Sequence, residues 1–169
     1  MIRVNLSELV NAKIGHRDHI DLDLVDLAVL DLHLVYLTGE LAFTRVTNGI
    51  LVEGELEASV ETECTRCLET FFEPILIELE DIINLPGAEL TQENPVRVAD
   101  DGWVNLSPLI REYAWLGLPI NPICSPDCRG LCPNCGGDLN KGECTCTEEE
   151  LGDPRWGVLR ALLEQNEES

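Results

Sequence analysis

The eight cysteines of this 169-residue chain fall into two sets of four, and this division constrains the fold more than any other feature. The compact set lies in one short stretch and consists of Cys132, Cys135, Cys144 and Cys146. The dispersed set consists of Cys64, Cys67, Cys124 and Cys128. Four thiolates are the number that a tetrahedral zinc ion takes from protein alone. The sequence therefore predicts one or two bound zinc ions in two closed sites.

The compact set has the spacing of a zinc knuckle. A Cys-Pro-x-Cys-Gly turn lets backbone N–H groups point toward the sulfurs of Cys132 and Cys135, and a Gly-rich loop then leads to Cys144 and Cys146. The closing C-x-C is tighter than the usual C-x-x-C. Iron in a rubredoxin-like centre and simple reduced thiols are the alternatives to zinc.

The dispersed set is open to more interpretations. A catalytic C-x-x-C pair is expected at a helix N-terminus, where the thiol pKa is lowered. Cys64 and Cys67 instead lie between two predicted strands and beside Glu63 and Glu69, which disfavour a thiolate. Because Cys124 and Cys128 also need partners, we expect one shared Cys₄ site that joins distant segments. An incomplete or metal-free site is the alternative.

Alternation of apolar and polar residues predicts an antiparallel meander. Residues 55–64 place glutamate at nearly every second position, and the pattern resumes over 71–80, after the C-T-R-C segment. An earlier strand over roughly 34–46 is followed by Thr47-Asn48-Gly49, a strong hairpin signal. Residues 20–41 carry a weaker pattern that favours strand after Ala28.

The remaining chain predicts a few helices, so the fold class is α+β: an antiparallel β-meander packed with helices, plus a Cys-rich zinc-knuckle segment. Ser107-Pro108 is typical of a helix start, with the serine as cap, and Gly117 and Pro119 end that helix. We expect a single domain over 1–169. Its parts are a β-rich body over about 30–123, a metal segment over 124–146 and a C-terminal helix over about 153–166. Residues 88–102 read as a mobile connection, and no repeat is evident beyond the C-x-x-C pairs.

The chain is strongly acidic. Eleven Lys and Arg against 32 Asp and Glu give a formal net charge of −21, and two Cys₄ zinc sites would make it about −25. A field of this sign repels a nucleic-acid backbone, so a basic protein is the expected direct partner. The N-terminus lacks the features of a secretory signal, and no apolar run is long enough to span a bilayer. We therefore expect a cytoplasmic protein with no membrane association, in which clustered cysteines bind metal.

Other candidate residues carry less chemistry. The histidines read as surface-facing and the three tryptophans as core. Three basic residues inside the cysteine loops are expected to offset thiolate charge, with RNA or partner contact as a second role; they are Arg66, Arg129 and Lys141. No nucleophile triad, phosphate loop or paired acid–base carboxylates appear at useful spacing, so we expect no enzyme activity.

Several short motifs, in order, resemble the YceD-like family, the large ribosomal RNA subunit accumulation proteins (domain of unknown function 177). Cys64-Thr-Arg-Cys67-Leu68 is similar to the family's CxRCL signature. The segments that start at Asn105, at Cys128 and at Asp153 are similar to its L–rE–LP stretch, its C-x-GLCP-x-CG-x-x-LN segment and its DPR triplet. The resemblance covers about residues 30–163.

The resemblance implies a non-enzymatic role in synthesis, processing or stability of large-subunit (23S) ribosomal RNA. It also implies that Cys64, Cys67, Cys124 and Cys128 form the site common to the family, with the compact set as an optional second one. The partner is then a basic ribosomal or rRNA-processing protein, with local or indirect contact to large-subunit rRNA. The alternative function is a redox or electron-transfer protein that uses the C-x-x-C thiols or a rubredoxin-like iron centre.

Overall fold

The computed structural model describes residues 1–89, 96–142, 144–146 and 156. The chain forms two compact units. The sheet unit comprises Met1–Cys64 and Glu69–Cys124, and the cysteine unit comprises Thr65–Leu68 and the residues from Ser125 onward. The predicted C-terminal helix over about 153–166 lies outside the described residues, except for Trp156.

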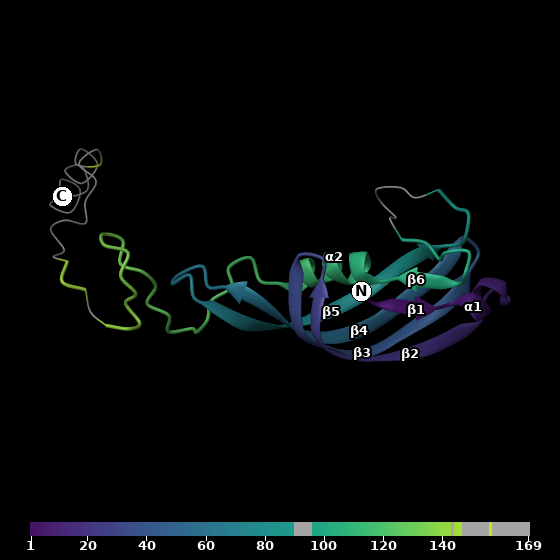
Figure 1. The fold of residues 1–169 in the computed structure, drawn as a ribbon, viewed down its shortest axis with the longest axis horizontal. Helices are drawn as coiled ribbons and strands as arrows, with labels where there is room; N and C mark the ends of the chain where they lie inside the picture. Colours follow the sequence, from purple (N-terminus) through teal and green to yellow (C-terminus); the bar gives the residue numbers. More distant parts are fainter. Residues whose placement is uncertain (90–95, 143, 147–155, 157–169) are drawn as a thin grey trace, which may run out of the picture. The chain divides into compact units, whose positions relative to one another are not determined.

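A four-stranded antiparallel meander dominates the sheet unit (Figure 1). Its strands, in spatial and sequence order, are β2 (Arg17–Val29), β3 (Leu32–Val46), β4 (Gly49–Glu63) and β5 (Thr70–Asn84). The predicted antiparallel meander is confirmed, and β2 adds a fourth strand to the three expected. The β3–β4 turn consists of Thr47 and Asn48, with Gly49 already paired to Val46.

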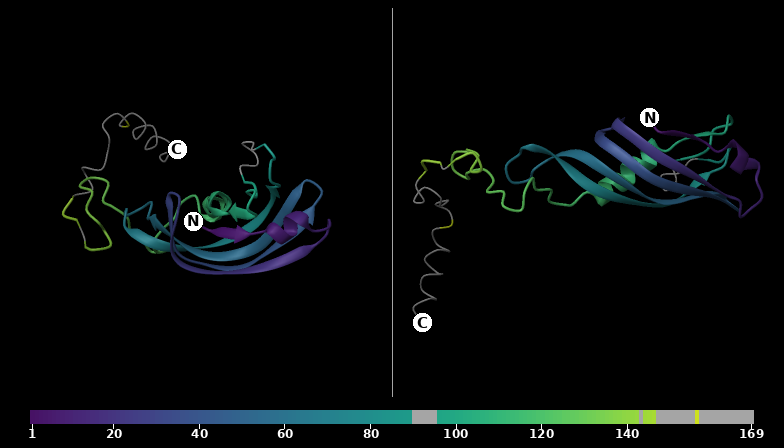
Figure 2. Two further views of the ribbon diagram at one scale, coloured as in Figure 1. Left: turned by 45° about the vertical axis from the view of Figure 1, so that its right-hand side comes forward. Right: turned by 90° about the horizontal axis from the view of Figure 1, so that it is seen from below.

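The sheet is curved, and its concave face holds the core (Figure 2). Helix α2 (Ser107–Gly117) lies on this face and contacts β5 and β2. Alternate strand residues point inward, as period-two patterning requires. The largest fully buried side chains of β3, β4 and β5 are Leu34, Leu37, Leu41, Phe43, Ile50, Leu56, Ile77 and Ile83.

A small second sheet reveals an internal repeat that the sequence analysis missed. Strand β1 (Arg3–Asn5) pairs antiparallel with β6 (Trp103–Asn105), with Val4 directly opposite Val104. Each strand runs into a helix through the same four residues, V-N-L-S, at 4–7 and 104–107. Helix α1 (Ser7–Asn11) follows the first copy and α2 follows the second.

The two copies of the repeat make equivalent hydrogen bonds. The amide of Leu6 donates to the carbonyl of Gly102 at 2.8 Å, and the amide of Leu106 donates to that of Ile2 at 2.9 Å. In each copy the asparagine Oδ1 accepts from the amide of the serine two residues later, at 3.0 Å from Asn5 and 3.1 Å from Asn105. The starts of α1 and α2 are therefore related to each other by a local two-fold symmetry.

Helix α2 begins and ends where the sequence predicts, but the predicted serine cap is wrong. The helix starts at Ser107 with Leu106 as its cap residue, and no side chain caps it. The buried hydroxyl of Ser107 instead accepts a hydrogen bond from the amide of Ile2 at 2.9 Å. It thus ties the N-terminal strand to α2.

One further expectation is extended and two are corrected. The weak pattern over residues 20–41 is two strands joined at Leu30-Asp31, where Leu30 takes φ +58° without the glycine or asparagine that usually marks such a turn. The 88–102 connection includes buried Val96 and Val98 and leads into β6, so it is not polar and mobile throughout. The tryptophans are not core residues, because Trp103, Trp115 and Trp156 are 38%, 49% and 62% exposed.

A search of the described residues for bilayer-spanning helices finds none with the length and hydrophobicity required.

Strands β3 and β4 approach closely at two glycines, which gives a stability prediction. A Cβ on Gly54 would lie 2.2 Å from the Glu40 carbonyl oxygen, and one on Gly39 would lie 2.3 Å from that of Glu55. Backbone must shift to admit either methyl group. We expect Gly54→Ala to lower the free energy of unfolding by about 2 kcal/mol or more, measured in urea. Gly142→Ala, which meets open space, is the control, and equal stability of the two variants would contradict the close approach.

A second prediction concerns pH. The carboxylates of Asp26 and then Glu61 accept hydrogen bonds from the His33 ring and raise its pKa, with ring nitrogens 2.9 Å and 2.8 Å from the two carboxylates. Because the folded pKa is raised, the stabilisation is fully present below the unfolded pKa of about 6.5 and is lost as pH rises through the folded pKa. We expect the stability difference between wild type and His33→Gln to shrink with rising pH over this window. A pH-independent difference in urea unfolding would contradict the ion-pair network.

Candidate metal centres and the acidic sheet face

The four sulfurs of the compact set gather at one point of the cysteine unit. The sulfur atoms of Cys132, Cys135, Cys144 and Cys146 all lie within 4.8 Å of one another. The Sγ atoms of Cys132 and Cys144 are 3.4 Å apart. The sequence spacing therefore produces the ligand cluster that it predicts, and Cys132 is the buried member while Cys135 is exposed.

Local backbone geometry makes this cluster suitable for a cation. The amides of Cys135 and then Asn134 donate to the Cys132 sulfur and lower the pKa of its thiol to about 6. The Cys135 thiol and then burial raise the pKa of Cys146 to about 12. Backbone N–H groups thus stabilise a thiolate at Cys132, whereas the neighbouring sulfurs disfavour a thiolate at Cys146. A bound divalent cation would offset this repulsion between thiolates, so the donor set fits Zn²⁺ or iron.

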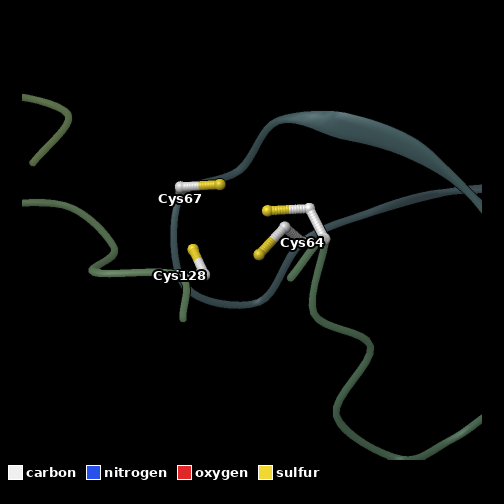
Figure 3. A group of neighbouring side chains, drawn as sticks. Cys64, Cys67 and Cys128 are labelled. Atoms are coloured by element: carbon white, nitrogen blue, oxygen red, sulfur yellow. The ribbon is translucent and has the colours of Figure 1, made fainter. Parts of the chain in front are cut away.

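The dispersed set also converges. The sulfurs of Cys64, Cys67, Cys124 and Cys128 all lie within 4.8 Å of one another. Figure 3 shows Cys64, Cys67 and Cys128 with their sulfurs turned toward a common point. These three are buried and Cys124 is more exposed. Each set of four therefore offers a complete tetrahedral donor set from protein alone.

The C-T-R-C segment lies where β4 and β5 join, as predicted. The last paired residues of the hairpin are Glu63 and Thr70, and the Cys64 amide donates to the Glu69 carbonyl at 2.9 Å. The segment then turns through Leu68, which takes φ +60°. No helix begins here, so the dipole that lowers the pKa of catalytic C-x-x-C thiols is missing at Cys64 and Cys67.

Arg66 stabilises the cysteine unit in a way that the sequence did not indicate. Its guanidinium Nη1 donates to the Cys128 carbonyl at 3.0 Å, and its own carbonyl accepts from the Leu131 amide at 3.0 Å. Gly130 lies beside the Arg66 carbonyl with φ +73°, and a Cβ at residue 130 would be 3.0 Å from that carbonyl oxygen. Arg66 therefore joins the C-T-R-C turn to the segment that leads into the compact set.

The other two basic candidates differ in their surroundings. Lys141 forms an ion pair with Asp138 at 3.2 Å and remains 71% exposed. The amide of exposed Arg129 donates to Asn140 Oδ1 at 2.8 Å. Asn140 Nδ2 also approaches the Cys128 sulfur at 3.5 Å. The loop that carries the basic residues thus supports a sulfur of the dispersed set.

The convex face of the sheet carries aligned carboxylates that we call the acidic face. It consists of Asp21, Asp23, Glu40, Glu53, Glu55, Glu57, Glu78 and Glu80. One row crosses all four strands, because the register pairs Asp21 with Glu40, Glu40 with Glu55, and Glu55 with Glu78. Residues directly opposite on antiparallel strands have Cβ atoms about 5 Å apart, so the like charges in this row repel one another.

Few cations balance the acidic face. His19 contacts Glu40, and Arg17 lies 3.8 Å from Glu53. The predicted surface-facing histidines are indeed exposed, with His16, His19 and His33 each beside a carboxylate. The sequence indicated the glutamates of β4 as one wet face. It did not show that β2, β3 and β5 add to the same face, because that depends on register.

Comparisons with family models and with individual proteins find relatives of this chain. A family model described as large ribosomal RNA subunit accumulation protein YceD matches residues 52–163. An uncharacterized protein of Mycobacterium tuberculosis is 35% identical over 127 residues, which cover 73% of this chain and 60% of the relative. One from Mycobacterium leprae is 31% identical over 129 residues, covering 73% and 58%.

A plant relative carries a functional name. The "large ribosomal RNA subunit accumulation protein YCED homolog 1, chloroplastic" of Arabidopsis thaliana is 27% identical over 150 residues, covering 72% of this chain and 46% of the relative. The chain thus spans 60% or less of the length of these three relatives. No solved structure matches it.

The two clusters give a prediction about metal content. We expect the purified chain to bind two metal ions, and Cys64→Ser and Cys144→Ser each to lose one, measured by native mass spectrometry. Hydrogen exchange should rise within 129–146 for Cys144→Ser, because only that loop loses its cluster. Cys64→Ser, which removes a fully buried ligand, should in addition lower the urea midpoint. Loss of both ions in either variant would contradict two separate sites.

Proposed function

The chain belongs to the YceD family of large ribosomal RNA subunit accumulation proteins, and on this premise we propose that it is a non-catalytic factor in large-subunit (23S) ribosomal RNA synthesis, processing or stability. It acts in the cytoplasm by binding a basic ribosomal or rRNA-processing protein. The plant relative's name supports the ribosomal assignment. The acidic face supports the choice of partner.

In this proposal the metal has a structural role. Both clusters supply four thiolates, which closes a tetrahedral site and leaves no position for substrate. Zinc is the proposed ion, because it is redox-inactive, as a structural role requires, and its filled d shell allows four thiolates to bind in a tetrahedron. A colourless protein that contains zinc is expected. A red, reducible centre would instead favour the redox or electron-transfer function.

The row Asp21–Glu40–Glu55–Glu78 is the observation that carries the choice of a basic partner. Like charges directly opposite one another each cost up to about 1 kcal/mol in an isolated sheet. Lys and Arg of a partner would remove this repulsion and would also speed the encounter through the field of the sheet unit. That unit carries 22 Asp and Glu against 6 Lys and Arg, a formal charge of −16.

Local contact with rRNA is a second candidate role, and it belongs to the cysteine unit. Over 65–68, 125–142 and 144–146 this unit carries Arg66, Arg129 and Lys141 against Asp127 and Asp138. These stretches therefore hold three basic against two acidic side chains, although the full cysteine unit, with 5 Lys and Arg against 10 Asp and Glu, has a formal charge of −5. Salt-sensitive binding of an rRNA fragment that weakens in Arg129→Gln and Lys141→Gln would support this role. Absence of binding at low salt would eliminate it.

The acidic row allows a test that separates function from folding. Glu40→Lys with Glu78→Lys places cations opposite Asp21 and Glu55, so stability in urea should stay equal or rise. Recovery of the basic partner should nevertheless fall by about tenfold, because affinity depends on complementary charge. Mature 23S rRNA in a deletion strain should fall with it. The control is Glu8→Lys with Glu89→Lys, exposed residues outside the row, and full complementation by the row variant would contradict the proposal.

A further inference from the structure

Two hollows flank the last turn of α2 in the sheet unit. One, of about 270 Å³, is lined by Thr62, Trp115, Leu118, Pro119, Ile120 and Pro122. The other, of about 200 Å³, is lined by Leu76, Glu78, Tyr113, Leu116 and Gly117. Because their linings alternate along residues 113–118, the two hollows lie on either side of one helical turn.

Large apolar side chains are exposed around both hollows. Ile120 is 95% exposed, Leu116 75% and Trp115 49%, and Leu76 on β5 is 48% exposed. Large exposed apolar side chains gathered around hollows are typical of a site of interaction. The volumes of the two hollows suit protruding side chains of a partner.

An ion pair beside Trp115 ties α2 to the β2–β3 turn. Arg111 grips the Asp31 carboxylate with both Nε and Nη2, the latter 2.6 Å from Oδ2. The hydrogen bonding from Arg111 is the largest cause of the lowered pKa of Asp31, and the Trp115 side chain lowers that pKa further. Trp115 is half-exposed, and tryptophan is among the residue types enriched at interaction hot spots.

The size of the hollows favours a polypeptide over a small ligand. Pockets for cofactors and drug-sized ligands occupy about 300–1,000 Å³ and enclose most of the ligand. Each hollow here is smaller, and the two are separated by the helical turn. Each accommodates one large apolar side chain, so a pair of such residues on one segment matches the pair of hollows.

Charge around the hollows specifies the rest of the partner. Glu78 lines the second hollow and is also the end of the Asp21–Glu40–Glu55–Glu78 row. Arg111, a basic residue on α2, is neutralised by Asp31, whereas Glu112 is exposed. The second hollow therefore lies at the β5 edge of the sheet, where Glu78 of the acidic face forms part of its lining.

We propose that the two hollows beside Trp115 and Leu116 form the apolar anchor of a docking surface for a basic polypeptide segment. That segment carries two large apolar side chains next to Lys or Arg, which lie over Glu78 and the acidic row. The inference rests on the proposed function, because it assigns the anchor for the basic partner named there. It adds the residues that select this partner among other basic proteins.

Photo-crosslinking in cells tests the anchor. Benzoylphenylalanine at position 116 of the full chain should crosslink, on illumination, to a segment that mass spectrometry identifies as basic and apolar. The same probe at position 14 is the control, since Ile14 is 66% exposed and lies outside both hollows. Crosslinks only within this chain or to a second copy, crosslinks to RNA, equal yields at both positions, or no crosslink would each overturn the proposal.

Matched variants then measure the contribution of the anchor. Leu116→Ser and Ile120→Ser remove exposed side chains, so the fold should survive, while affinity for a synthetic peptide of the crosslinked sequence should fall at least tenfold. Ile14→Ser should leave that affinity within twofold. Equal affinities of all three variants would overturn the anchor.

The two proposals fail separately. If Leu116→Ser abolishes peptide binding but 23S rRNA levels stay normal in cells, the docking surface stands and its ribosomal role is wrong. If the Glu40→Lys, Glu78→Lys variant lowers 23S rRNA but position 116 yields no crosslink, the ribosomal role stands and the anchor is wrong.

Discussion

The register of the meander β2–β5 is the constraint on which the sheet unit depends. Side chains alternate across each strand, so one register decides at once which residues enter the core and which face water. It places Leu41 and Leu56 inside and brings Glu40 opposite Glu55 outside. A slip of one residue would put those carboxylates in the core. The burial of the leucines therefore enforces the repulsion within the acidic face, which the fold tolerates because burial of a leucine is worth about 1.5–3 kcal/mol.

Alternation and turn signals made much of this fold predictable. The 55–64 and 71–80 patterns and the Thr47-Asn48-Gly49 turn predict β3, β4 and β5, and Ser107 and Gly117 bound α2. The β2–β3 turn could not be predicted, because exposed Leu30 takes a positive φ that its side chain disfavours, and no glycine or asparagine marks the position. The V-N-L-S repeat was visible in the sequence but is too short to be significant until the pairing of Val4 with Val104 relates its two copies.

The two cysteine sets differ in how far spacing determines them. The compact set is a local loop, so its cluster follows from the knuckle turn and the glycines around it. The dispersed set depends on where the β4–β5 hairpin ends, which no local spacing encodes. Arg66 shows the same limit. Sequence proximity indicated a counter-ion for thiolates, whereas its hydrogen bond to the Cys128 carbonyl gives it a structural contact. The conformation of the turn that carries a basic side chain thus decides which groups that side chain contacts.

The unequal distribution of charge between the two units bears on the proposed ribosomal role of so acidic a chain. Most of the formal −21 belongs to the sheet unit, which carries −16, whereas the cysteine unit carries −5 and groups Arg66, Arg129 and Lys141 in its loops. Beyond a Debye length of about 8 Å at physiological salt, repulsion from the acidic face is largely screened. A basic protein on that face would neutralise it further. Protein binding by one unit and local RNA contact by the other are therefore compatible, and the first would favour the second because it lowers the negative field that RNA meets.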